Sequence, residues 1–141
     1  MTVSDVLADL AAPDLPAAKP QDQGLWTRCV EAVRGNLANT HLAEQATVVC
    51  GAVERLWDRL RGDHGEFDIV FADPPYEHRP WGEFLRALLT GWNGVAQDGV
   101  VVVQCRAGSG PGAAPAGGPT RVKALGDTEM RFYESSQPDG P

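Results

Sequence analysis

The chain has 141 residues, a formal net charge of −7, and a composition that is 43% hydrophobic and 22% charged. This composition fits one globular domain with a hydrophobic core and excludes a disordered chain. The acidic balance also argues against tight, non-specific binding of nucleic acids, because such binding depends on an excess of Lys and Arg.

From the amino terminus onward, hydrophobic periodicity predicts helices that alternate with strands, followed by a hairpin. Residues 1–24 are expected to be a flexible leader, in which Ser4 could cap a short helix over residues 3–12. The elements predicted after the leader are a helix over 25–39, a strand over 45–51, a helix over 52–62 that Gly62 ends, a strand over 66–72, a helix over 81–92, a strand over 99–105 and a hairpin over 120–135.

Two of these strands, "EFDIVFA" and "GVVVVQC", are continuous apolar runs, which are typical of strands buried on both faces of a parallel sheet. The turn "QDG" at residues 97–99 is expected to lead into the second strand. The sequence therefore predicts an α/β domain over residues 25–135, with helices on both faces of the sheet and an antiparallel hairpin at its edge. A flexible Gly/Pro loop is expected over 107–119 and a tail over 136–141.

The cysteines and histidines give no sign of a metal site. Cys29, Cys50 and Cys105 are widely spaced without a Cys-x-x-Cys pair, and the three histidines lack metal-ligand spacing. The longest apolar run is too short to cross a bilayer, and the first twenty residues do not resemble a secretory signal. We therefore expect a cytoplasmic protein without a bound metal or disulfides.

The segment "FDIVFADPPY" is the strongest candidate for a functional site. Asp73 follows an apolar strand directly, and ligands of open parallel sheets bind beyond the carboxyl ends of their strands. Pro74 and Pro75 fix the backbone and contribute no N–H, so the carboxylate and two carbonyls remain as acceptors. These acceptors suit a ligand with an –NH2 group, and Tyr76 could stack on its ring. A strand-ending turn with Tyr76 packed on the surface is the alternative.

Such a pocket could activate an exocyclic amine of a nucleobase. Acceptors that take both N–H bonds would turn the nitrogen lone pair toward a methylsulfonium, so that positioning does most of the catalytic work. The base must first leave any stack to reach the pocket.

Three further segments accompany "FDIVFADPPY", namely "VRGNLANTHLAEQATVVCGAVERLW", "GVAQDGVVVVQC" and "VKALGDTEMRFYES". Over residues 28–135 the chain resembles the carboxyl-terminal part of the RsmD family, which are S-adenosylmethionine-dependent methyltransferases of guanine N2 in small-subunit ribosomal RNA. The resemblance implies a truncated Rossmann-like class I methyltransferase sheet, with S-adenosylmethionine as cofactor and ribosomal RNA or a ribosomal subunit as partner. It assigns the amine-orienting role to Asp73, Pro74, Pro75 and Tyr76, and Asn36 and Leu37 match a helix-ending Asn-Leu.

The chain departs from this family in several places. No apolar strand and no Gly-rich cofactor loop are found in residues 1–27. Gly51 and Ala52 fall where the family contacts the cofactor's adenine, but Ala52 replaces an Asp, and Gln104 replaces a common Glu. The strand over 45–51 would then pair directly with the strand over 66–72 or separate from it, and a protein partner or self-association could complete the sheet.

Three alternatives to this enzyme remain open. The first is a non-catalytic binding module with a degenerate methyltransferase fold. The second is a methyltransferase of adenine N6 in DNA, because Asp-Pro-Pro-Tyr serves both bases. The third is a permuted enzyme whose cofactor loop includes Gly108, Gly110 and Gly112, although the residues that follow cannot form the helix that such a loop opens.

Overall fold

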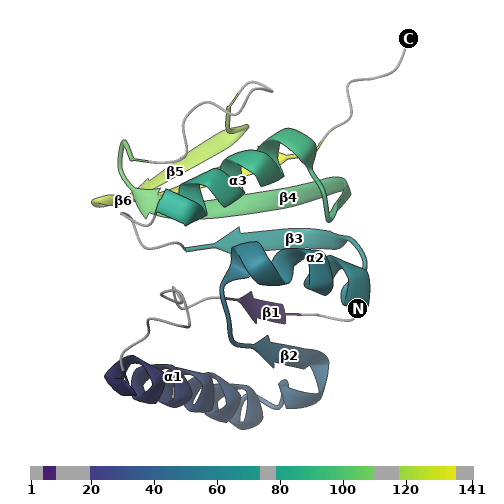
Figure 1. The fold of residues 1–141 in the computed structure, drawn as a ribbon. Coiled ribbons are helices and arrows are strands. Elements are labelled where there is room, and N and C mark those ends of the chain that lie inside the picture. The colour runs from purple at the N-terminus through teal and green to yellow at the C-terminus, as the bar shows by residue number, and fades with distance from the viewer. Residues whose placement is uncertain (1–4, 9–19, 74–78, 110–117, 136–141) are drawn as a thin grey trace. The chain divides into compact units, whose positions relative to one another are not determined.

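The computed structural model describes residues 5–8, 20–73, 79–109 and 118–135. These residues form helices and a mixed sheet of the α/β class. The chain divides into two compact units, Met1–Arg59 and Leu60–Pro141, and each is described by itself (Figure 1).

The first unit contains two short parallel strands and a long helix. Strand β1 spans Asp5–Ala8 and pairs with β2, Ala46–Val49, in a register that joins Asp5 to Ala46 and Ala8 to Val49. Between them lie helix α1, Pro20–Asn39, and a short 3-10 helix, Ala43–Gln45. Helix α2, Val53–His64, begins in this unit and ends in the second.

Two expectations for the amino-terminal residues were wrong. The segment Asp5–Ala8, expected within a short helix, is a strand, because the backbone partner offered by β2 outweighs a weak local helix preference. Because β1 is a strand, the expectation that residues 1–27 contain no apolar strand was also wrong. Helix α1 also begins at Pro20, five residues earlier than predicted, since proline is well tolerated at a first helical position.

The second unit is built on a four-stranded sheet in the order β3-β4-β6-β5 (Figure 1). Strand β3, Phe67–Ala72, runs parallel to β4, Val95–Arg106, while β6, Thr128–Glu134, is antiparallel to both β4 and β5, Arg121–Leu125. Helix α3, Arg79–Gly91, connects β3 to β4. The predicted helix, strands and carboxyl-terminal hairpin of this unit are therefore confirmed.

Most of the core of this unit lies on one face of the sheet. Leu85 and Leu89 of α3 are almost fully buried, as are Val101 and Val103 of β4 and Tyr133 of β6. The register pairs Val101 with Tyr133, so these side chains share one face. We infer that α3 covers this face, since it presents three buried leucines at helical spacing.

Two glycines correct the predicted element boundaries. Helix α2 runs through Gly62 to His64, and the chain turns at Gly65, whose φ of +78° lies in the left-handed region that glycine adopts freely. The expected turn at residues 97–99 lies inside β4 as an irregularity, where the pairing shifts between Phe67 and Ile69 of β3. A Cβ atom at Gly99 would lie 2.7 Å from the Ala96 carbonyl oxygen, so only glycine fits there.

Strand β3 is also less buried than predicted. Its side chains were expected to be buried on both faces, but Ile69 is 69% exposed and Phe71 is 56% exposed. Only Ala72 is fully buried in this strand. None of the helices in the described part of the chain is long and apolar enough to cross a membrane.

Candidate functional site

The carboxyl ends of β3 and β4 meet at one edge of the sheet. Ala72, the last residue of β3, is in register with Val103 of β4, so Asp73 and Gln104 follow at the same level. Asp73 directly follows β3, which is held by its hydrogen bonds to β4. Because Asp73 is exposed, its carboxylate is accessible to a ligand. Pro74, Pro75 and Tyr76 lie outside the described residues, so the acceptor pocket that they would complete stays a prediction.

A polar cluster lies beyond Gln104, and the sequence reasoning did not find it. Glu129 of β6 accepts hydrogen bonds from Arg131 Nε at 2.8 Å and from the Gly108 backbone N–H at 3.3 Å. The same carboxylate lies 2.6 Å from Arg131 Nη2 and 3.9 Å from the Cys105 sulfur. The cluster therefore joins the hairpin to the turn that follows β4.

Burial and pairing set the protonation of this cluster. The hydrogen bond from Arg131 lowers the pKa of Glu129, so the carboxylate stays ionised. Burial raises the pKa of the Cys105 thiol, which keeps it neutral and unreactive. Burial also raises the pKa of Tyr133. The cluster thus holds one fixed ion pair beside the carboxyl end of β4 and presents no activated nucleophile.

The spacing of Glu129 and Arg131 was the signal in the sequence that could have revealed this cluster. Residues two apart on a strand point to the same face, so an acid and a base at this spacing can pair. The hairpin was predicted, but which of its faces would be buried was not. The pair faces the core, where Glu129 and Arg131 are 12% and 19% exposed.

Gly51 and Ala52, the residues predicted to contact the cofactor, lie in the first unit between β2 and α2. Both are buried, and the Ala52 carbonyl accepts hydrogen bonds from the backbone N–H groups of Arg55 and Leu56 at 3.0 Å. A Cβ atom at Gly51 would lie 2.8 Å from the Leu56 side chain. These residues therefore form the turn that starts α2, and they offer a ligand backbone groups but no polar side chain.

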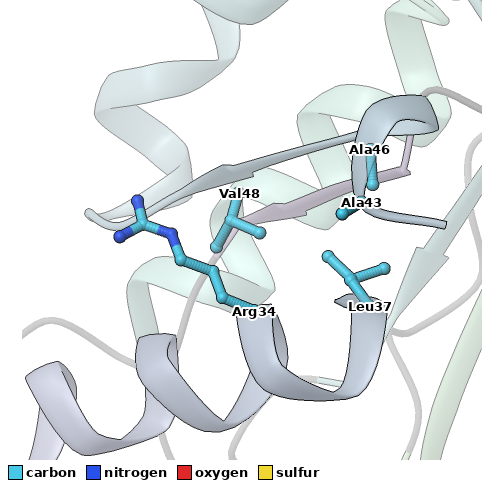
Figure 2. Close-up of a pocket in the computed structure, with 5 residues that line it drawn as sticks. All are labelled: Arg34, Leu37, Ala43, Ala46 and Val48. Atoms are coloured by element: carbon cyan, nitrogen blue, oxygen red, sulfur yellow. The ribbon is translucent and has the colours of Figure 1, made fainter. Parts of the chain in front are cut away.

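A pocket of about 300 Å³ lies in the first unit, among α1, the short 3-10 helix and β2 (Figure 2). Its walls are apolar except for the Arg34 side chain, and Leu37 points toward it from the end of α1. The lining residues are Arg34, Leu37, Ala43, Ala46 and Val48. Asn36 and Leu37 end α1 through their carbonyls, which accept hydrogen bonds from Thr40 Oγ1 at 2.8 and 3.2 Å.

The described residues hold no group of three or more His, Cys, Asp and Glu side chains that could bind a metal ion.

Solved structures with this fold include proteins from several bacteria. A conserved hypothetical protein from Streptococcus pyogenes matches 94% of the chain with a TM-score of 0.65 and 21% identity. A hypothetical protein from Thermus thermophilus matches 93% of the chain with a TM-score of 0.62 and 19% identity. An S-adenosylmethionine-dependent methyltransferase from Neisseria gonorrhoeae matches 78% with a TM-score of 0.50 and 18% identity. The likeness shows that the chain shares the α/β fold of these structures.

Residues 26–134 match the family described as conserved hypothetical protein 95, and the chain belongs to this family. No sequence among curated proteins matches it significantly. The chain spans 62% of the length of the Thermus protein, 72% of the Streptococcus protein and 47% of the Neisseria enzyme.

Proposed function

We propose that this chain takes part in S-adenosylmethionine-dependent methyl transfer to the exocyclic N2 amine of a guanine in small-subunit ribosomal RNA. The observation that supports this proposal is the position of Asp73. It follows the parallel strand β3 directly, at the edge where ligands of open α/β sheets bind, in a fold shared with a methyltransferase. The guanine and the ribosomal RNA come from the resemblance of the "FDIVFADPPY" region.

Asp73 would act by accepting a hydrogen bond from the amine and orienting its nitrogen. The cofactor, when bound, supplies a methyl group from a sulfonium and keeps the electrons of the broken S–C bond, while the amine loses one proton. The Asp73 carboxylate can hold or pass on that proton, because it is exposed to water. Tyr76 would stack on the displaced base, and the carbonyls of Asp73 and Pro74 would accept its N–H groups.

The described residues fit the cofactor only in part. Gly51 and Ala52 are buried in the turn that starts α2, and neither has a side chain that can bind a ribose or balance a sulfonium. We therefore assign to this chain the orientation of the amine, and a non-catalytic binding module is the second candidate function. The observation that favours the second candidate is the alanine at position 52, where a carboxylate would be expected.

Titration calorimetry with S-adenosylmethionine separates the two candidates. Binding in the micromolar range would support an enzyme, whereas no binding at millimolar cofactor would exclude catalysis by the chain alone. Methyl transfer to unmethylated small ribosomal subunits would then be measured, with adenine-containing DNA as the competing substrate.

Asp73→Ala and Asp68→Ala form a matched pair for this assay, since both carboxylates are exposed and belong to the same segment. Loss of an orienting acceptor is expected to lower the rate by about 100-fold or more in Asp73→Ala. Asp68→Ala is expected to keep full activity. Equal rates in the two variants would contradict the role proposed for Asp73.

A further inference from the structure

The turn between α3 and β4 contains the pair Asn93–Gly94. The chain has three asparagines, and Asn93 alone precedes a glycine. The backbone nitrogen of the residue after an asparagine can attack the side-chain carbonyl carbon, Cγ, and close a five-membered succinimide ring. Glycine hinders this attack least, because it has no side chain and a permissive backbone. The sequence of this turn therefore suits an intramolecular reaction.

The backbone nitrogen of Gly94 is available as the nucleophile. Its N–H donates no hydrogen bond among the described residues, whereas its carbonyl accepts one from the Phe67 N–H at 2.8 Å. The second unit contains another pair, Asp98–Gly99, in which an aspartate could form the same ring. There the Gly99 N–H donates a hydrogen bond to the Ser135 hydroxyl at 3.1 Å. The two pairs thus differ in whether the attacking nitrogen is already bonded.

The side chain of Asn93 is polarised by a residue from another element. Its Oδ1 atom accepts a hydrogen bond from Nη1 of Arg61, in α2, at 3.1 Å. Both residues belong to the second unit. When the Gly94 nitrogen attacks Cγ, negative charge develops on Oδ1, and a donor that is already in place stabilises it. The arginine side chain stays protonated at every physiological pH, so this donor is always charged.

We propose that Asn93 is a site of self-catalysed deamidation, at which Arg61 stabilises the oxyanion of the tetrahedral intermediate. The Gly94 nitrogen loses its proton to water and forms a bond to Cγ. The bond between Cγ and Nδ2 then breaks, and the side-chain nitrogen takes up a proton and leaves as ammonia. Water opens the succinimide, so residue 93 becomes an aspartate or an isoaspartate, and the chain gains one negative charge.

The two products should act differently on the fold. An aspartate leaves the main chain unchanged, and its carboxylate would form an ion pair with Arg61. An isoaspartate adds one methylene to the main chain directly before Gly94. Because the Gly94 carbonyl bonds to the Phe67 N–H, and Phe67 is in register with Val95, this product would weaken the start of the pairing between β3 and β4.

Incubation of the full chain at mildly alkaline pH, followed by peptide mass spectrometry, tests this proposal. Deamidation is expected at Asn93, and chromatography of the peptides should find no isoaspartate at Asp98. Arg61→Gln should slow the reaction by about 3–10-fold in the folded chain, a smaller loss than in a water-excluded site because solvent also hydrates the oxyanion. Arg86→Gln is the matched control, since it removes the same charge from an exposed position of α3 and should leave the rate unchanged.

The same comparison in urea separates the contact from the local sequence. Arg61 and Asn93 are 32 residues apart, so the contact depends on the fold, and the original chain and Arg61→Gln should deamidate equally when unfolded. A folded Arg61→Gln variant that reacts as fast as the original chain, or faster, would overturn the role of Arg61. An unmodified Asn93 in the folded chain, or a reaction at Asp98 as fast as that at Asn93, would overturn the site.

Discussion

Strands β3 and β4 are parallel neighbours with similar apolar sequences, yet they differ in burial. On the core face, Val101 and Val103 of β4 are fully buried, and so is Ala72 beside Val103. On the other face, Ile69 and Phe71 of β3 are mostly exposed, although Val102 beside Phe71 is buried. Strand β4 has a strand on each side, β3 and β6, whereas β3 is paired on one side only within its sheet. The difference is clearest on the face away from the core, where Phe71 of β3 is 56% exposed beside Val102 of β4 at 8%. Strand β3 leads directly into the exposed Asp73.

The largest expected effect comes from the core that covers β4. Leu89 of α3 is fully buried, so Leu89→Ala should lower the free energy of unfolding by about 2–5 kcal/mol, through lost burial and a cavity. Ile69→Ala, made in the exposed strand, should change it by less than about 0.5 kcal/mol. Urea unfolding monitored by circular dichroism would measure both variants. Similar losses in the two would show that β3 is covered in solution.

A smaller effect is expected from the glycine at the irregularity between the two strands. Gly99→Ala would place a Cβ atom 2.7 Å from the Ala96 carbonyl oxygen and 3.2 Å from the Asp68 carbonyl oxygen. Because backbone cannot move away as a side chain can, we expect a loss of about 1–3 kcal/mol. Gly82→Ala in α3 meets no atom within 4 Å and should instead stabilise the chain by about 0.4–1 kcal/mol. Thermal unfolding of both variants would check this difference in sign.

The ion pair at the end of β4 predicts how stability changes with pH. The pKa of Glu129 is lower in the folded chain than its ordinary value of 4.5, chiefly because Arg131 donates a hydrogen bond to it. The stabilisation is therefore present above about pH 4.5 and is lost as the pH falls through the lowered folded pKa. Glu129→Gln should lose this part of the pH dependence while keeping a hydrogen-bond acceptor. A free energy of unfolding that falls equally in both proteins between pH 7 and pH 3 would contradict it.

The smallest expected effect concerns the site itself. Asp73→Asn should leave the free energy of unfolding unchanged within about 0.5 kcal/mol, because Asp73 is exposed. Its effect should appear in ligand binding or methyl transfer alone. A clear loss of stability would indicate that the carboxylate has a structural partner and would weaken its assignment to the site.

Local sequence signals predicted most of the second unit. The apolar runs indicated β3 and β4, and the Gly-Asp pair at residues 126–127 indicated the turn of the hairpin. In the structure, Gly126 has a φ of +64° in this turn. Signals of this kind depend on residues close together in the chain. The four short segments that follow one another in the RsmD-like order also indicated the α/β fold class, which the structure confirms.

Other features could not be read from the sequence, because they depend on distant partners. Strand β1 is four residues long and forms through pairing with β2, about forty positions away. The exposure of Ile69 depends on what packs against its face of the sheet. The Glu129–Arg131 pair required knowledge of which face of β6 is buried. Asp73 was predicted and lies at the end of β3, whereas the roles of Pro74, Pro75 and Tyr76 stay predictions.

The position of β6 has a consequence for the order of folding. Strand β6 lies between β4 and β5, so the sheet cannot close until residues up to Glu134 have been synthesised. Ser135, which follows β6, then binds the first half of β4. Its hydroxyl accepts a hydrogen bond from the Gly99 N–H at 3.1 Å and donates one to the Ala96 carbonyl at 2.6 Å. Until that step, β4 lacks its neighbour β6 in the four-stranded sheet. In a nascent chain β4 would therefore wait for this neighbour while residues 107–134 are added, an interval in which chaperones act on aggregation-prone strands.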